Sequence, residues 1–421
     1  MARAASKNPA ARRLRKPALD FSLTGLIYSA MMLFMGLAAI NSQANLLFAV
    51  FGLMIGVLLV SGVISRLVLK RLEVHRTLPE HGVAGRRTTW HYRVTNAKRF
   101  WPSLSVQFTE LDAGDAFTRP PQAYMLHVAA RQTAMVPVEV IPARRGLHPL
   151  GEFQLITSFP FGFIKRAIVM KREESFLVYP PLAEVDPKLL GLFLSAEKSG
   201  ARMRPRRGGY DEFYGVKDYR GGENPRWIYW RRSARTGRLV SREMSAVAPP
   251  RLLIVLDAQP RGWTAEELAA AEKSIAIAAS LAAAALARGL SVGLAAWDGG
   301  LVEISPSRGK RHRRELLEAL ARLDLRSGGP AFDATKALVE LARPGTTAVL
   351  VRARDGGREG VEPSRQARMT IAAESEQTDR WFTFERGVDF AAIGRVMAAS
   401  GPPSAGGRVM GRPARAVGAG A

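Results

Sequence analysis

The sequence predicts a membrane-anchored protein of α/β and β architecture: a two-helix transmembrane hairpin, an antiparallel β-sandwich-like domain and a doubly wound α/β domain. Three patterns support this prediction. No charged residue lies between Asp20 and Arg66. From residue 72 to 181, apolar and polar residues alternate with the period of two typical of strands. From residue 248 to 399, apolar strand-like runs alternate with helical segments, which indicates a parallel sheet with crossover helices.

The uncharged segment over residues 21–65 is too long for one membrane span and fits two spans of about 20 residues each. We expect the helices near Phe21–Ile40 and Leu46–Ser65, joined by a turn in the polar cluster Asn41–Asn45. Because the second apolar segment follows the first at once, we do not expect a cleaved signal peptide.

Basic residues flank the hairpin on both sides, and the loop between the helices carries no charge. The positive-inside rule therefore predicts that both termini and the soluble domains lie in the cytoplasm, tethered to the inner face of the cell membrane. Residues 1–20 form a basic N-terminal tail in this prediction. The flanking basic residues are Arg3, Lys7, Arg12, Arg13, Arg15 and Lys16 before the first helix, and Arg66, Lys70, Arg71 and Arg76 after the second.

Short alternating runs between residues 72 and 181 predict the strands of the β-sandwich-like domain. They are Trp90–Val94, Leu104–Phe108, Val136–Val140 and Phe176–Tyr179, the last of which ends at Pro180-Pro181.

The α/β domain is expected over residues 248–399. Arg251–Asp257 is an apolar run that ends in an acid, as expected for a buried parallel strand. Thr264 and Glu267 form a capping pair at the start of an alanine-rich helix. Further strands are expected at Ser291–Trp297 and Thr347–Val351, and further helices at about 313–323 and 332–342. Residues 400–421 are rich in Gly, Pro, Ala and Arg, and we expect a disordered tail.

The densest group of charged and aromatic residues lies in Tyr210–Glu243, within a linking region at residues 182–247. Gly221-Gly222 predicts a turn, Asn224-Pro225 the start of a helix and Gly237 its end. Trp227, Trp230 and Ala234 recur at helical spacing, so we expect them to face a core. The segment is then either a buried clamp between the domains or a surface for an anionic partner.

This segment resembles the domain-of-unknown-function 58 family. The residues that carry the resemblance are Glu212-Phe213, Lys217-x-Tyr219, Gly222-Glu223, Arg226-x-Ile228-x-Trp230 and Ala234-Arg235. Lys217 and Glu223 stand where the family usually has Arg and Asp. Arg145-Gly146 and Phe159–Phe163 resemble two further family segments, which we interpret as turn and packing devices. The resemblance implies a bacterial inner-membrane protein whose partner is a MoxR-type AAA+ ATPase.

The order of strands and helices in residues 248–399 resembles a von Willebrand factor A-like domain. Such domains often hold Mg²⁺ through carboxylate and hydroxyl oxygens, the ligands that a hard cation prefers. The match here is degenerate, so we expect no metal and no other cofactor, with Mg²⁺ at Asp257 and Asp355 as the weaker alternative. In the metal-free reading, Arg261 pairs with Asp257 or Asp355. The positions of the degenerate site are Asp257, Gln259, Arg261, Pro330 and Asp355.

Composition and motifs favour a protein without catalytic activity. The chain has no cysteine, no phosphate-binding loop and no nucleophile elbow, and its six histidines are scattered. The net charge of +24 suggests an anionic partner. Three functions remain open: an adaptor for the ATPase or its client in the assembly or maturation of envelope proteins, a membrane-tethered nucleic-acid or anionic-polymer binder, and a hydrolase that uses Glu212 and Glu223. The signature residues expected to contact a partner or clamp the domains are Glu212, Lys217, Tyr219, Glu223, Arg226, Trp230 and Arg235.

Overall fold

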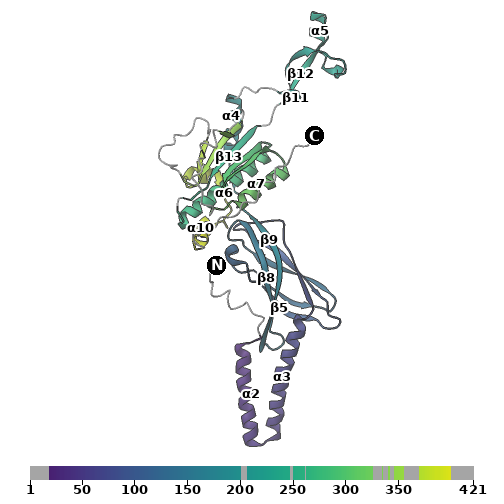
Figure 1. The fold of residues 1–421 in the computed structure, drawn as a ribbon, viewed down its shortest axis with the longest axis vertical. Helices are drawn as coiled ribbons and strands as arrows, with labels where there is room; N and C mark the ends of the chain where they lie inside the picture. The colour runs from purple at the N-terminus through teal and green to yellow at the C-terminus, as the bar shows by residue number, and fades with distance from the viewer. Residues whose placement is uncertain are drawn as a thin grey trace.

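The computed structural model describes residues 19–200, 206–246, 250–260, 262–325, 334, 340–341, 346–354 and 369–399, with residues 19, 194–200, 206–214 and 243–246 as backbone only. The molecule is elongated (Figure 1). A helical hairpin lies at one end, and a β domain and an α/β domain follow along the long axis. A small module that contains the strands β11 and β12 and the helix α5 lies at the opposite end. The expected helix at 332–342 lies mostly outside the described residues, and the expected tail at 400–421 lies wholly outside them.

The hairpin consists of α2 (Leu23–Ser42) and α3 (Asn45–Leu69), close to the predicted spans. Both are long and apolar enough to cross a membrane. Only 17% of the most apolar segment of α2 and 6% of that of α3 are buried within the protein. The alanine-rich helix α6 (Ala265–Ala287) is also long and apolar enough to cross a membrane, but 78% of its most apolar segment is buried within the protein. By this measure α2 and α3 are candidate membrane spans, whereas α6 belongs to a protein core.

A lysine joins α3 to the β domain. The Lys98 ammonium donates hydrogen bonds to the carbonyls of Leu67 (2.9 Å) and Val68 (2.8 Å) at the end of α3, and also contacts the hydroxyl of Ser103. Ser103 Oγ donates to the Val68 carbonyl at 2.7 Å. The last turn of a helix leaves carbonyls without intrahelical donors, and a cation there is favourable. Burial nevertheless lowers the pKa of Lys98 to about 8.

The lowered pKa of Lys98 predicts a pH-dependent stability. Between about pH 8 and 10.5 the unfolded chain holds a proton on this lysine that the folded chain has lost. The free energy of unfolding should therefore rise with pH through this window, relative to a Lys98→Met variant. Denaturant unfolding of both proteins in detergent at pH 7 to 11 checks this, and parallel stability curves would contradict it.

The β domain is a sandwich of two sheets. One sheet has the order β2-β4-β7, and the other has the order β1-β9-β8-β5-β6 with β3 paired to β9. Side chains from both sheets meet in one core, which includes Trp90, Tyr92, Phe108, Phe153 and Phe176. The elements are β1 (Leu19–Phe21), β2 (Leu72–Thr77), β3 (Gly82–Val83), β4 (Thr88–Asn96), β5 (Ser103–Glu110), η1 (Gly114–Ala116), β6 (Gln122–Val128), β7 (Thr133–Val140), β8 (Gly146–Thr157) and β9 (Ile164–Tyr179). The predicted alternating strands thus build the expected sandwich.

Three residues near the helical hairpin differ from their expected roles. Leu19 and Asp20 do not continue the basic tail, because β1 pairs antiparallel with Ile164–Arg166 of β9. Arg76 is not a charge that faces the membrane surface, because its side chain is buried in the sandwich.

The α/β domain is built on a sheet of order β15-β14-β13-β16-β17. β14, β13, β16 and β17 are parallel, and β15, which the sequence pattern did not predict, is an antiparallel edge strand. Its elements are β10 (Glu184–Val185), α4 (Pro187–Gly200), β13 (Arg251–Asp257), α6, β14 (Ser291–Trp297), β15 (Leu301–Ser307), α7 (Lys310–Arg322), β16 (Thr346–Arg352), β17 (Met369–Ala372), α9 (Glu376–Trp381), β18 (Phe382–Thr383) and α10 (Phe390–Ala399).

Both faces of this sheet are covered. Leu252, Ile254 and Leu256 of β13 join one core with α6 and α7, while Leu253 and Val255 join a second core with Ala334 and Leu341. Thr264 caps α6 as predicted, since its side chain accepts from the Glu267 N–H. Alternate burial on two faces is the mark of a sheet between helical layers.

Residues 182–193 belong to the α/β domain and not to the region that was expected to precede it. β10 pairs with β18, and Val185, Leu189, Leu190 and Phe193 join the main core of the α/β domain. The linking region therefore begins after this point, along α4.

A buried ion pair locks the sandwich to the α/β domain. Arg145 pairs with Glu272 of α6, with side chains 4% and 5% exposed. Its Nε donates to the carbonyl of Leu320 at 3.0 Å, and its Nη2 donates to that of Leu323 at 2.8 Å, at the end of α7. A buried clamp between the two domains is thus present at Arg145, outside the Tyr210–Glu243 segment.

Candidate partner-binding surface

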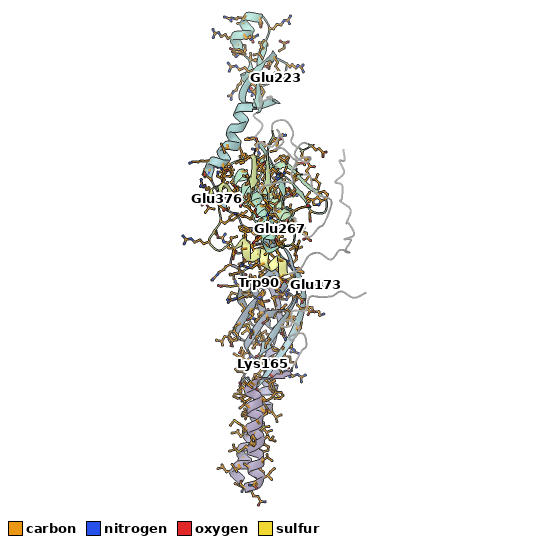
Figure 2. The ribbon with its side chains drawn as sticks, turned by 90° about the vertical axis from the view of Figure 1, so that its left-hand side faces the viewer. Trp90, Lys165, Glu173, Glu223, Glu267 and Glu376 are labelled. Carbon is orange, nitrogen blue, oxygen red and sulfur yellow. The ribbon has the colours of Figure 1, made fainter. Side chains whose placement is uncertain are left out.

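A small module, which we call the signature module, projects from the α/β domain (Figure 1). It contains β11 (Arg206–Asp218), η2 (Pro225–Trp227), α5 (Trp230–Thr236) and β12 (Val240–Ala246). β11 and β12 form an antiparallel pair of their own, apart from the large sheets. Figure 2 shows Glu223 in this module, far from the hairpin and beyond the α/β domain.

The turn of the module and the two ends of its helical segment follow the predicted local signals. Gly222 has a φ of 100°, which suits the turn after β11. Asn224 Oδ1 accepts from the Arg226 N–H at 3.1 Å, with Pro225 in the first turn. Gly237 ends α5 in the left-handed conformation, with its N–H on the carbonyl of Ser233.

Three of the predicted signature residues hold the module together. The carboxylate of Glu223 accepts from Lys217 Nζ at 2.8 Å and from Ser241 Oγ at 3.1 Å. Tyr219 Oη donates to the Glu223 carbonyl at 2.9 Å. The Lys217 hydrogen bond is the largest cause that holds the pKa of Glu223 below its usual value. An ionised carboxylate held in this way suits a structural role better than proton transfer.

The predicted apolar stripe is wrong for two of its three residues. The helix is interrupted between η2 and α5, so the helical spacing does not continue from Trp227 to Trp230. Trp230 is 65% exposed and Ala234 is also exposed, whereas Ile228 and Ser233 are the buried residues. Ser233 Oγ accepts a hydrogen bond from the Val240 N–H at 2.9 Å. This bond joins α5 to β12.

The outer surface of the module is basic and aromatic. Residues 215–242 hold eight basic residues against two acidic ones. Five exposed arginines have no carboxylate partner within the described part of the chain: Arg226, Arg231, Arg232, Arg235 and Arg238. Leu239 is a further exposed apolar residue that the sequence pattern did not single out. Trp and Arg are enriched at the energetic centres of protein interfaces.

Glu212 belongs to this module by sequence, and its backbone pairs with Ser245 of β12. Its side chain lies outside the described residues, and so does any contact between it and Glu223.

The carboxyl edge of the α/β sheet holds the described part of the degenerate metal site. Asp257 ends β13, and the Arg352 Nε of the neighbouring β16 lies 3.9 Å from its Oδ2. Gln259 follows, half-buried, while Arg261, Pro330 and Asp355 lie outside the described residues. The positive charge of this guanidinium disfavours a divalent cation beside the Asp257 carboxylate. Arg352 is thus a guanidinium beside Asp257 that the sequence pattern did not single out, and the expected pairing of Arg261 lies outside the described residues.

The family comparison bears on this part of the chain. Residues 215–352 match the family model "Protein of unknown function DUF58". The match runs from the end of β11 to the end of β16, so it includes most of the signature module and the centre of the α/β sheet. It confirms the DUF58 part of the resemblance over this stretch. No curated protein matches the chain.

Proposed function

We propose that this membrane-associated protein is a non-enzymatic adaptor that presents its DUF58 signature module to a cytoplasmic partner. The observation that carries the proposal is the exposure of Trp230 among exposed arginines that have no carboxylate partner in the described part of the chain, on a module that projects away from the hairpin. An indole that is not needed for the core and several exposed guanidinium groups provide a surface suited to a protein partner of negative charge.

The partner that the DUF58 resemblance implies is a MoxR-type AAA+ ATPase. A von Willebrand A-like fold of the α/β domain would agree with this role. The four parallel strands in the order β14-β13-β16-β17, with an apolar core on each face of the sheet, support that interpretation. With the soluble domains in the cytoplasm, the module would meet the ATPase away from the membrane surface. The outcome would be recruitment of the ATPase or its client for assembly or maturation of envelope proteins.

Capture from native membranes tests the proposal. Tagged full-length protein is crosslinked in membranes with and without ATP, purified and analysed by mass spectrometry. The adaptor function predicts enrichment of an AAA+ ATPase. If no ATPase is enriched under either condition, the partnership is contradicted.

A second function, binding of nucleic acid or another anionic polymer, is favoured by the same exposed Trp230 and arginines. Stacking on an indole and phosphate contacts by arginine are how such polymers bind. The two functions differ in their response to salt and in the captured molecule. Polymer binding must weaken steeply as salt rises, because each phosphate contact releases a counterion. Capture that persists after nuclease treatment excludes nucleic acid as the ligand.

A further inference from the structure

We propose that four exposed aromatic side chains at the base of the sandwich insert into the bilayer interface and seat the soluble part of the protein on the membrane. They are Phe21, Phe100, Trp101 and Phe161, which we call the aromatic collar. This inference depends on α2 and α3 crossing the membrane, and it is independent of the adaptor proposal.

The first half of the collar is fixed at the end of α3. Lys98 bonds to the carbonyls of Leu67 and Val68, and the next residues lead directly to Phe100 and Trp101. Asn96 Nδ2 donates to the Trp101 carbonyl at 3.0 Å, which holds this loop in place. Phe100 is 75% exposed and Trp101 is 57% exposed. About 20 residues of α3 cross a hydrocarbon layer of roughly 30 Å, so residues 66–69 lie at the headgroup level.

The second half is fixed at the start of α2. The Ser22 N–H donates to the Phe163 carbonyl at 3.0 Å, and the Tyr28 ring stacks on the Phe163 ring with centroids 4.2 Å apart. A Cβ at Gly25 would overlap the Phe163 carbonyl, so the loop and the helix are in close contact. Phe161 therefore lies beside the first residues of one span, as Phe100 lies beside the last residues of the other.

Charge around the collar fits a lipid surface. Figure 2 shows Lys165 where the hairpin meets the sandwich. Exposed cations at this level would face anionic headgroups. Among the exposed acids of this region, Asp20 is opposite Lys165 in the β1–β9 register, and Glu73 follows the exposed cation Arg71 by two residues. Aromatic rings at both ends of a span prefer the interface between hydrocarbon and water. The exposed cations are Arg66, Lys70, Arg71, Arg99 and Lys165.

The absence of cysteine from the chain makes a clean test possible. Full-length Phe100→Cys and Phe161→Cys variants are nitroxide-labelled and placed in nanodiscs of zwitterionic and anionic phospholipid. Leu301→Cys is the matched control, because Leu301 is also an exposed apolar residue but lies in β15 of the α/β domain. Power-saturation electron paramagnetic resonance measures collisions of each label with oxygen and with a water-soluble nickel chelate.

The expected result is a ratio of oxygen to nickel collisions several-fold higher at positions 100 and 161 than at 301. Equal nickel access at all three positions would overturn the proposal. Low access to both reagents at positions 100 and 161 would also overturn it, because this would indicate cover by protein and not by lipid.

Discussion

Replacing Arg145 by alanine is expected to lower the free energy of unfolding by about 3–5 kcal/mol, the range found when one partner of a buried ion pair is removed. The change leaves the Glu272 carboxylate buried without its guanidinium. It also removes the donors to the carbonyls of Leu320 and Leu323. The α/β domain should then separate more easily from the sandwich. Denaturant unfolding and limited proteolysis of the full-length protein in detergent measure both effects.

A double substitution separates the lost ion pair from lost packing. Arg145→Met with Glu272→Met removes both charges while keeping most of the apolar volume, and such replacements are often close to neutral. The double variant should therefore be more stable than Arg145→Ala, and its cost should be less than the sum of the two single methionine variants. A loss below about 0.5 kcal/mol in Arg145→Ala would contradict the assignment of this pair as the lock between the domains.

A comparable loss, about 3–5 kcal/mol, is expected for Glu110→Ala in the sandwich. Glu110 accepts from Arg76 Nε and Nη2, each at 2.8 Å, and both side chains are fully buried. Tyr92 Oη also donates to this carboxylate, and burial is the largest cause that raises the pKa of the Tyr92 phenol. Removing the carboxylate leaves a buried guanidinium whose remaining carboxylate contact in the described part of the chain, Glu174, is 3.7 Å away.

Tyr92→Phe is the matched control for Glu110→Ala. It removes one hydrogen bond to the charged group and keeps the ion pair and the ring stacked on Phe108, so it should cost about 1.5–3 kcal/mol. Both variants are compared with wild type by chemical unfolding monitored by circular dichroism. A larger loss in the free energy of unfolding for Tyr92→Phe than for Glu110→Ala would show that the Glu110 carboxylate is not the centre of this cluster.

The elements that were predicted from the sequence are those whose type depends on a strong local pattern, whereas α4, β17, α9 and α10 were not predicted. The uncharged run identified α2 and α3, and the apolar run Arg251–Asp257 identified the central parallel strand. Asn224-Pro225 and Gly237 identified the bounds of the helical turns between them. β15 escaped prediction because its pattern is exposed almost throughout, which gives an edge strand little apolar signal.

The roles of single charged residues could not be predicted, because they depend on contacts between distant segments. Arg76 follows a membrane span and resembles a headgroup contact, yet it pairs with Glu110 from another strand. Arg145 stood out only as part of a turn, although its partner is 127 positions away, at Glu272. Trp230 was expected in a core, but the break between η2 and α5 turns it outward. A single sequence carries no signal for such pairings or for that break.

The adaptor proposal is tested most directly by quantitative capture with the signature module altered. Wild type, Trp230→Ala with Arg235→Ala, and Leu301→Ala with Arg313→Ala are crosslinked in native membranes with ATP and purified at equal yield. The control pair replaces one exposed apolar residue and one exposed arginine away from the module. The account predicts that wild type and the control capture equal amounts of an AAA+ ATPase. The module variant should capture at least about tenfold less ATPase, because it lacks two residues expected to be hot spots of the interface. Equal capture by all three proteins, or no ATPase with wild type, would contradict it.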